Sequence, residues 1–351
     1  MVQKGKQINS MRMTISDIAR LANVSTSAVS IVINNKKGVS EKTRASILEI
    51  IKEFKYNPNQ IAKSLAAKET KSIGLIIEEI DNPYFAKVMR GVYNASSQLG
   101  YSVLLGSSEL SPDKEIENIN TLVSKRVDGL IIFPLHNKNA DFTYLSNLLY
   151  EKYPLVILGH IKNYITNIVD IDNTKAAYDA VSYLIKQGHK KIAHFFGSFH
   201  SGHGEERLDG YTQALMDNNI AINKNQIISV EPEMLSGYNV GKDFFSKRGE
   251  RPTAVFCYND LVAIGLMNAL MDMGINVPND VSVMGFDNIE FGQFIKTPLT
   301  TVEVCAYETG KAAAKLLIKQ IKSSKMPMNE KVILEHKIIE RQSVKKILVK
   351  K

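Results

Sequence analysis

Hydrophobic residues near the start of the chain recur at helical spacing in three short segments. Thr14 and Asp17 form a T-x-x-D capping box, which predicts that a first helix begins at about Ile15. Ser25 can cap a second helix, and Ser40 can cap a third. Two short helices across a tight turn, completed by a third, are typical of a helix-turn-helix domain. The predicted apolar stripe of the third helix is Ile47, Leu48, Ile51 and Phe54.

The second helix carries polar residues where a core helix would carry apolar ones, in the run "STSAVS". A DNA major groove admits one α-helix, and a recognition helix reads bases from its N-terminal residues. We therefore expect Thr26, Ser27 and Ile31 to face bases. Ser30, Asn34 and Thr43 are expected to donate hydrogen bonds to phosphates. The alternative is a helical hairpin that packs against the rest of the protein.

A short basic segment separates this head from the remaining chain. Asn57-Pro58 ends the third helix, because the residue before a proline avoids the α region. The run "NQIAKSLAAK" at 59–68 could form a helix of barely two turns, which is marginal on its own in water. Its apolar Leu65 could wedge between base pairs in the minor groove. The alternative is a plain linker.

From Ser72 onward, short apolar runs alternate with amphipathic helical stretches. Such alternation predicts right-handed βαβ units and parallel sheets. The rhythm repeats in two blocks, roughly 72–160 and 161–287, and the tail adds two segments. We therefore predict an α/β core of two doubly wound parallel-sheet lobes, with a ligand cleft between them. The strand candidates are 73–77, 101–106, 129–133, 155–159, 191–196, 227–230, 254–258 and 281–286, followed by 300–304 and 331–339.

Polar residues that directly follow these strands should line the cleft, and Arg207 opens a helix after the turn "FFGSFHSGHGEER". Tyr84, Phe85 and Phe291 could stack on a sugar ring or another planar ligand. The turn itself, with His203 in it, is either a ligand-contacting loop or solvated, rather than a metal site. The polar candidates are Glu78, Asp81, Asn82, Ser107, His160, Asp172, Asn173, Ser198, Asn259, Asp260, Asp287 and Asn288.

Composition and charge narrow the function. Residues 1–71 hold 13 Lys/Arg and five Asp/Glu, which gives this segment a net charge of +8. The whole chain of 351 residues has the same net charge, so the excess lies in the head. This distribution indicates a polyanionic partner for the head. The chain has two distant cysteines, no apolar run long enough for a membrane span and no apolar signal segment, so we expect a cytoplasmic protein. The sequence has no Walker, H-E-x-x-H or G-x-S-x-G motif, which argues against an enzyme, and we predict no metal and no cofactor.

The order of these motifs resembles the LacI/GalR family of bacterial transcriptional regulators. The resemblance rests on "TISDIARLANVSTSAVSIVIN", "IGLIIEEIDNPYF", "KRVDGLIIFP", "ERLDGYTQAL", "YNDLVAIGLMNAL" and "NVPNDVSVMGFDN". It implies a helix-turn-helix domain at 13–57, a hinge helix and linker at 58–71, and a two-lobed core for effector binding and dimerisation at 72–343, similar to periplasmic sugar-binding proteins. The tail after "ERQS" has no heptad array, so we expect a homodimer.

The resemblance also implies partners and site residues. The expected partners are double-stranded palindromic operator DNA and a sugar or sugar phosphate that controls a repressor of carbohydrate metabolism. The alternative is a global catabolite regulator with a phosphorylated carrier protein as corepressor. The DNA-binding residues implied are Thr14, Ser25, Thr26, Ser27, Ser30, Ile31, Asn34, Thr43, Asn59, Ala62 and Leu65. The effector-binding residues expected are Phe85, His160, Asp172, Arg207, Asn259 and Asp287.

Departures from the family pattern concern specificity. Ile31 stands where many members have arginine, and Gly159 occupies a position that is acidic in some sugar-binding members. Glu78 and Glu79 form an unusual acidic pair at the cleft. These residues bear on the operator sequence and on the effector, not on the class of protein.

Overall fold

The structure is a computed structural model of the chain, and it describes residues 13–56, 69–135, 142–159, 161, 164–197, 202–247, 251–323 and 329–347. The chain divides into two compact units, Met1–Thr70 and Lys71–Lys351. The predicted hinge helix, with Asn59, Ala62 and Leu65, lies outside the described residues, as do His160 and Ser198.

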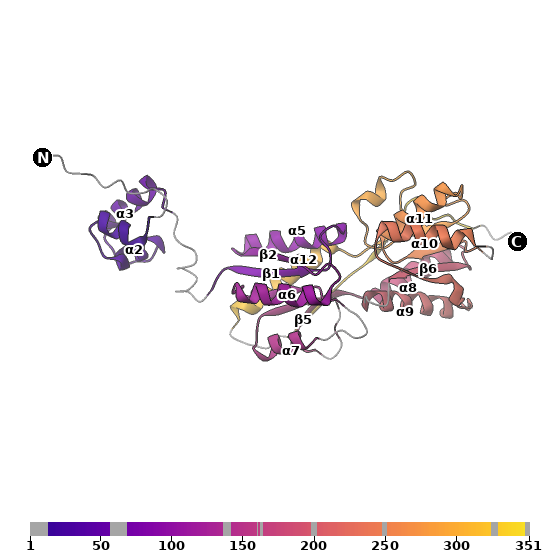
Figure 1. Ribbon diagram of the computed structural model, residues 1–351, viewed down its shortest axis with the longest axis horizontal. Coiled ribbons are helices and arrows are strands. Elements are labelled where there is room, and N and C mark those ends of the chain that lie inside the picture. Colours follow the sequence, from indigo (N-terminus) through magenta and orange to yellow (C-terminus); the bar gives the residue numbers. More distant parts are fainter. Residues whose placement is uncertain are drawn as a thin grey trace. The chain divides into compact units, whose positions relative to one another are not determined.

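Over its described residues, the first unit is a head of three helices, α1 (Ile15–Leu21), α2 (Thr26–Ile33) and α3 (Glu41–Glu53) (Figure 1). The predicted capping box of Thr14 and Asp17 is formed, and Ser25 and Ser40 cap the next two helices. The head core comprises Ile18, Ala19, Val29, Val32 and Ile47. The apolar stripe predicted for α3 is wrong in part, because Leu48 and Phe54 are 48% and 38% exposed.

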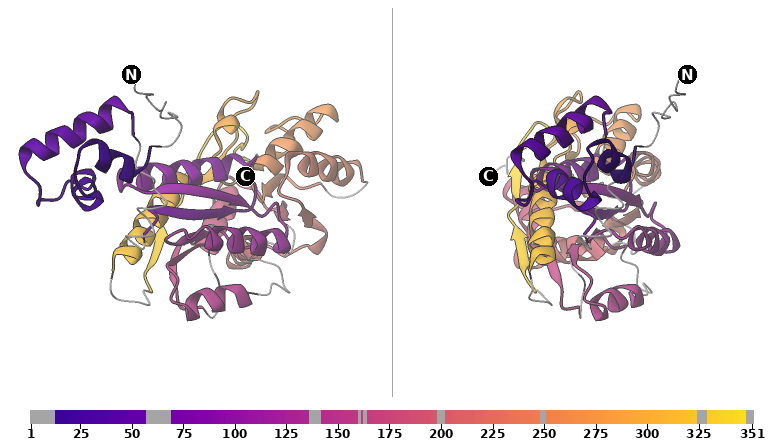
Figure 2. Two further views of the ribbon diagram at one scale, coloured as in Figure 1. Left: turned by 60° about the vertical axis from the view of Figure 1, so that its left-hand side comes forward. Right: turned by 90° about the vertical axis from the view of Figure 1, so that its left-hand side faces the viewer.

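The second unit is the predicted α/β core of two lobes (Figure 1). Among the described residues, its first lobe, the N-lobe, has a six-stranded parallel sheet in the order β11-β5-β4-β3-β1-β2, with β1 and β2 side by side (Figure 2). The N-lobe strands are β1 (Ser72–Ile77), β2 (Ser102–Ser107), β3 (Leu130–Ile132), β4 (Leu155–Leu158), β5 (Asn167–Ile171) and β11 (Lys331–Leu334). Its helices are α5 (Pro83–Gln98), α6 (Pro112–Ser124), α7 (Thr143–Tyr150) and α12 (Ala306–Lys322).

The other lobe, the C-lobe, has a four-stranded parallel sheet in the order β7-β6-β8-β9 and an antiparallel pair, β10 with β12. Its strands are β6 (Ile192–Gly197), β7 (Ile227–Val230), β8 (Ala254–Cys257), β9 (Ser282–Met284), β10 (Thr301–Glu303) and β12 (Lys337–Ile339). Its helices are α8 (Asn173–Lys186), α9 (Gly202–Asp217), α10 (Met234–Ser246) and α11 (Asp260–Asp272), with short 3-10 turns η1 (Lys224–Gln226) and η2 (Glu290–Gln293).

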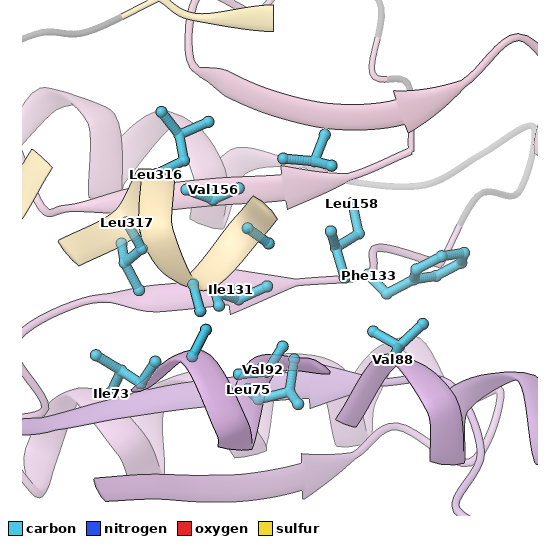
Figure 3. Close-up of a cluster of buried hydrophobic side chains, with 14 of the residues drawn as sticks. Ile73, Leu75, Val88, Val92, Ile131, Phe133, Val156, Leu158, Leu316 and Leu317 are labelled. Carbon is cyan, nitrogen blue, oxygen red and sulfur yellow. The ribbon is translucent and has the colours of Figure 1, made fainter. Parts of the chain in front are cut away.

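Successive side chains of each buried strand point to opposite faces of the sheet, so each sheet has an apolar layer on both faces. In the N-lobe, Leu75 and Ile131 pack with α5 and α12, while the intervening Ile76 and Ile132 pack with α6 and α7. Figure 3 shows the first layer, in which side chains of β1, β3 and β4 meet Val88 of α5 and the leucines of α12. In the C-lobe, α10 and α11 cover one face of the sheet, and α8 and α9 cover the other.

Over the described residues, the chain crosses between the lobes at three places, and the first of them was predicted at the wrong position. β5 (167–171) pairs with β4 and β11 in the N-lobe sheet, so the crossing follows Ile171 rather than residue 160. The segment 331–339, read as one strand, is two strands, β11 in the N-lobe and β12 in the C-lobe. The third crossing joins β10 to α12 at Cys305, whose φ is +50°. Over the described residues, no helix has the length and hydropathy of a membrane span.

Candidate functional site

The surface of α2 is the first candidate site. Thr26 and Ser27, the first residues of α2, are exposed, and Lys36 and Lys37 are exposed in the turn after it. Ile31, expected to face outward, is half-buried, and its Cδ1 lies 3.5 Å from the position of a Cβ on Gly38, whose φ of +136° favours glycine. The exposed hydroxyls at the N-terminus of α2 are therefore the groups best placed to read a groove.

The residues expected to contact phosphates each form a hydrogen bond within the head. The Thr14 hydroxyl donates to Asp17 Oδ2 at 2.7 Å, and Ser25 Oγ accepts from the Ala28 N–H at 3.2 Å. Asn34 Nδ2 donates to the Ser30 carbonyl at 2.9 Å. A capping hydroxyl that accepts retains its own proton, so Ser25 can still donate to a phosphate, whereas the Thr14 proton is already engaged.

A cleft between the N-lobe and the C-lobe is the second candidate site. It holds about 630 Å³ of empty space, counting the open solvent at its mouth. Both lobes and two crossings contribute to its walls, so movement of one lobe against the other changes its shape. Its lining is Glu78, Glu79, Asn82, Tyr84, Phe85, Phe133, Gly159, Val169, Asp170, Ile171, Asn173, His203, Arg207, Pro232, Tyr258, Asn259, Asp287, Val304 and Thr309.

Arg207, from α9, lies in the C-lobe wall of the cleft and is 7% exposed. Its Nε donates to Asn173 Oδ1 at 3.1 Å, and its Nη1 donates to the Tyr258 carbonyl at 2.5 Å. The guanidinium carbon is 3.7 Å from the centre of the Phe286 ring, and Nη2 is 3.9 Å from Asp287 Oδ1. Arg207 is therefore held rigidly, with its charge paired inside the protein.

Asp287 projects from a turn with unusual backbone geometry. The φ angles of Asp287 and Asn288 are +105° and +51°, although neither residue is glycine. Beneath the turn, the fully buried Asp260 accepts from the Ile289 N–H at 2.8 Å and from the Thr301 hydroxyl at 2.5 Å. Burial raises the pKa of Asp287 to about 6, against the opposing effect of Arg207. The fold therefore holds this carboxylate at the cleft at a cost, which is typical of functional positions.

Asn173 and His203 extend this polar wall. Because Arg207 Nε donates to Asn173 Oδ1, the amide Nδ2 of Asn173 faces His203 Nδ1 at 3.0 Å. The His203 ring also lies 5.2 Å from the Phe133 ring. Gly159 makes room for it, because a Cβ at that position would stand 2.8 Å from His203 Cε1. An acidic side chain at position 159 would therefore require His203 to move.

The N-lobe wall combines aromatic and acidic groups. Tyr84, Phe85 and Phe133 form an edge-to-face cluster, with the Phe85 and Phe133 centroids 5.0 Å apart. Glu78 follows β1 directly, and burial raises its pKa to about 7. Burial also raises the pKa of the neighbouring Glu79. The wall can thus stack on a ring and accept hydrogen bonds from it.

One hydrogen bond joins the lobes at the edge of this site. Lys87 Nζ of α5 donates to the Asn288 carbonyl at 2.7 Å. The Asn288 side chain is fixed in turn by Arg341 Nη2 at 2.6 Å and by Glu303. Because Asn288 adjoins Asp287, the turn that carries the cleft carboxylate also makes a contact with the N-lobe.

Some of the predicted cleft residues line the cleft in the structure, and others do not. Phe85, Arg207, Asn259 and Asp287 line the cleft, although both polar atoms of Asn259 are engaged, Oδ1 with the Val262 N–H and Nδ2 with the Pro232 carbonyl. Asp172 does not line it, because its exposed carboxylate caps α8 by accepting from the Lys175 N–H. Asp81, Ser107, Asp260, Asn288 and Phe291 also lie outside the lining.

Several lining residues were not predicted, or were predicted differently. His203 was read as part of a turn, but α9 begins at Gly202, so His203 is in the first turn of the helix and is 8% exposed. Arg207 accordingly lies in the second turn of α9 rather than opening it. Asp170 was not predicted as a cleft residue, because the strand that carries it, β5, was not predicted. Among the described residues, no group of His, Cys, Asp and Glu side chains could hold a metal ion.

Comparisons with known proteins match both units. Residues 14–59 match the family described as bacterial regulatory proteins of the lacI family, and residues 181–344 match a periplasmic binding protein-like domain. Over 334 residues the chain is 35% identical to the HTH-type transcriptional repressor PurR of Klebsiella pneumoniae (strain 342), covering 94% of this chain and 96% of that protein. The chain belongs to the lacI family of bacterial regulatory proteins.

Two solved structures agree with the fold. The lac repressor dimer bound to operator and the anti-inducer ONPF has a TM-score of 0.85 at 24% identity, covering 95% of this chain and 99% of that one. The transcriptional regulator CelR in complex with cellobiose has a TM-score of 0.71 at 27% identity, covering 95% of this chain and all of that one. The prediction of a helix-turn-helix head with a two-lobed α/β core is confirmed.

Proposed function

We propose that the protein is a DNA-binding transcriptional repressor of the lacI family whose operator affinity is set by a small polar effector in the inter-lobe cleft. The observation that best supports the proposal is that one chain contains two candidate sites. An exposed polar helix N-terminus lies on a basic head, and a rigid Arg207–Asp287 pair lies in a cleft built from two lobes. The family contains regulators rather than enzymes, in keeping with the absence of catalytic motifs from the sequence.

In this proposal the head (13–57) supplies DNA recognition through Thr26 and Ser27, which are exposed at the start of α2. Ser25, Ser30, Asn34 and Thr43 hold the head against phosphates. The backbone N–H and the hydroxyl of Thr14 both donate to Asp17 Oδ2, so a phosphate contact by Thr14 would have to replace one of these hydrogen bonds. Ile31 supplies an apolar surface and no hydrogen bond to a base. The expected insertion of Leu65 into the minor groove, within 58–71, stays a prediction.

For the effector we propose a small ring that carries hydroxyl groups. Phe85 and Tyr84 offer faces for the ring, while Asp287, Asn173 and Arg207 offer acceptors and donors from the opposite wall. The likeness to the CelR–cellobiose complex supports a sugar, since aromatic and carboxylate groups together suit a polyol. A carbohydrate-linked role in the cytoplasm and a phosphorylated carrier protein as the alternative corepressor both stay predictions.

The proposed control runs through the lobes of the core (72–343). A ligand that contacts Asp287 and the N-lobe wall together favours one spacing of the lobes over another. In a homodimer, that spacing would set the separation of the two chains where they leave the core at 58–71, and hence the fit of two heads to a palindrome.

Selection of DNA from a random duplex library by the full-length protein tests the proposal. We expect the selected sequences to share a palindrome, with steep salt dependence of binding. Ser27→Ala should weaken binding to that palindrome by about tenfold and relax its sequence at one symmetric position per half-site. Ser46→Ala is the matched control, because Ser46 is an exposed serine on α3. Selection of no shared sequence would refute the proposal.

A further inference from the structure

Three polar side chains form a continuous hydrogen-bonded chain in the C-lobe wall of the cleft. Arg207 Nε lies 3.1 Å from Asn173 Oδ1, and Asn173 Nδ2 lies 3.0 Å from His203 Nδ1. All three residues line the cleft and are buried. The positions of the protons along this chain therefore follow from the chemistry of each group.

Arg207 sets the direction of the hydrogen bonds. A guanidinium nitrogen can only donate, so the oxygen of the Asn173 amide must face Arg207, and the NH2 group of the amide must face His203. The NH2 group is a donor, so Nδ1 of His203 must be the acceptor. The imidazole that completes this chain is therefore neutral, with its proton on Nε2.

A protonated imidazole does not fit the same chain. Both ring nitrogens of a charged histidine are donors, so Nδ1–H of His203 would face the NH2 group of Asn173. Turning the Asn173 amide over would give His203 an acceptor, but it would place the NH2 group against the Nε–H of Arg207. Uptake of a proton by His203 therefore costs one of the two hydrogen bonds, whichever way the amide is turned.

The carboxylates around the ring favour the proton that the chain excludes. On α9, Glu206 Oε2 lies 3.6 Å from His203 Nδ1, whereas the charge of Arg207 opposes protonation. The charged groups that face the ring from other elements are Asp170 of β5, Glu78 after β1 and Asp287 after β9. Burial lowers the pKa of His203, but Glu206 and Asp170 raise it by more, so the pKa lies above its ordinary value. The carboxylates and the Asn173 amide thus make opposite demands on one imidazole.

The N-lobe encloses the ring at this position. The Phe133 ring centre lies 5.2 Å from the centre of the imidazole. Beside Gly159, an added Cβ would stand 2.8 Å from Cε1 and 3.0 Å from Nε2 of His203. The ring is therefore held next to Asn173 by contacts from the opposite lobe.

We propose that His203 is a positioning residue for Arg207, and that its neutral imidazole holds the Asn173 amide in the orientation that accepts the Nε–H of Arg207. Protonation of the imidazole breaks the chain and releases Arg207 from one of its anchors. The inference rests on the proposed function, because the position of Arg207 bears on regulation only if the cleft binds an effector. It gives the cleft a proton-sensitive element in addition to the groups that contact the effector.

Nitrogen NMR of the full-length protein tests this proposal without a ligand and without DNA. Histidine and arginine are labelled with 15N, and spectra are recorded from roughly pH 5 to pH 8.5. The His203 signals are those missing from His203→Asn, and the Arg207 Nε–H is identified by cross-peaks to the Phe286 ring, whose centre lies 3.7 Å from the guanidinium carbon. We expect Nδ1 to be the unprotonated nitrogen of His203 at high pH. The Arg207 Nε–H signal should shift with the same midpoint as His203.

Two substitutions at position 203 separate positioning from packing. Asparagine has an oxygen near the place of Nδ1 and takes up no proton in this range, so in His203→Asn the Arg207 signal should keep its high-pH position through the His203 midpoint. Leucine keeps the bulk of the side chain but has no acceptor, so in His203→Leu the signal should be displaced at every pH. The control is His336→Gln, at a histidine that contacts Asp179 outside the cleft lining, and it should titrate as the parent does.

The proposal is overturned if Nδ1 carries the proton at high pH, if His203 keeps one charge state throughout, or if His203 titrates while the Arg207 signal stays in place. It is also overturned if His203→Asn shifts as the parent does, or if His203→Leu rather than His203→Asn keeps the high-pH signal. The parent and His203→Asn decide the matter even where His203→Leu does not fold. If all these expectations hold but no compound alters binding to the selected palindrome, the proposed function fails while the positioning role of His203 is retained.

Discussion

Replacing Arg207 by methionine removes a positive charge from the lining of the cleft while keeping much of the volume of the side chain. Asn173 Oδ1 and the Tyr258 carbonyl each lose a buried hydrogen bond, of 3.1 and 2.5 Å respectively. Each acceptor left without a partner costs about 1–3 kcal/mol. Asp287 also loses its nearest cation, and breaking a buried ion pair typically costs about 3–5 kcal/mol. Since these costs overlap, we expect Arg207→Met to destabilise the core by about 3–5 kcal/mol.

The assay is thermal unfolding of the full-length protein, and the expected shift in Tm is a fall of roughly 10 °C. Arg207→Met combined with Asp287→Asn should recover part of this loss, because no unpaired charge then remains. The control is Lys247→Met, which breaks the exposed ion pair with Asp243 and should leave the Tm unchanged. If Arg207→Met unfolds within about 2 °C of the parent protein, Arg207 is not the paired, buried group described above.

Three further predictions concern the cleft. Lys87→Met removes the hydrogen bond to the Asn288 carbonyl and should weaken effector binding several-fold in calorimetry; unchanged affinity would exclude a role for this contact. Burial raises the pKa of Glu78 to about 7 in the folded state, so the protein loses stability as pH rises from about 4.5 to 7. The Tm of Glu78→Gln relative to the parent should therefore increase across that window, and a constant difference would contradict this. Gly159 and Gly100 both have positive φ, but a methyl group at position 159 would stand 2.8 Å from the His203 ring, whereas a methyl group at position 100 meets nothing within 4 Å. Gly159→Ala should therefore lower the Tm more than Gly100→Ala, and equal losses would rule out the steric conflict.

The parts of the fold that follow from local pattern could be predicted from the sequence. The head depends on three capping residues and on helical spacing, and most strands are continuous apolar runs. β5 could not be recognised, because Asn167 and Asp170 interrupt its apolar pattern, yet both are buried. Among the described residues, the hydrogen-bond partners of the Asn167 side chain are distant in sequence: Gln320 of α12 and the Glu330 N–H. Contacts across 150 residues or more leave no local signal in the sequence.

Several residues that line the cleft could be predicted from their positions just after strands. The rule that ligands bind beyond the ends of parallel strands led to Glu78, Asn173 and Asp287, all of which line it. The rule fails where a polar residue is used to cap a helix, as with Asp172, because capping and ligand binding favour the same residue types. His203 could not be assigned from sequence, since its burial depends on the space left by Gly159 in the other lobe.

The central claim is that a ligand in the cleft of the core controls DNA binding by the head. The most direct measurement is the affinity of the full-length protein for its selected palindrome, by fluorescence anisotropy, in the presence of hexoses, amino sugars and hexose phosphates, each added separately. The parent protein and Asp287→Asn are compared side by side. The account predicts that at least one compound changes the affinity of the parent protein about tenfold or more and leaves that of Asp287→Asn nearly unchanged. No change with any compound, or the same change in both proteins, would contradict it.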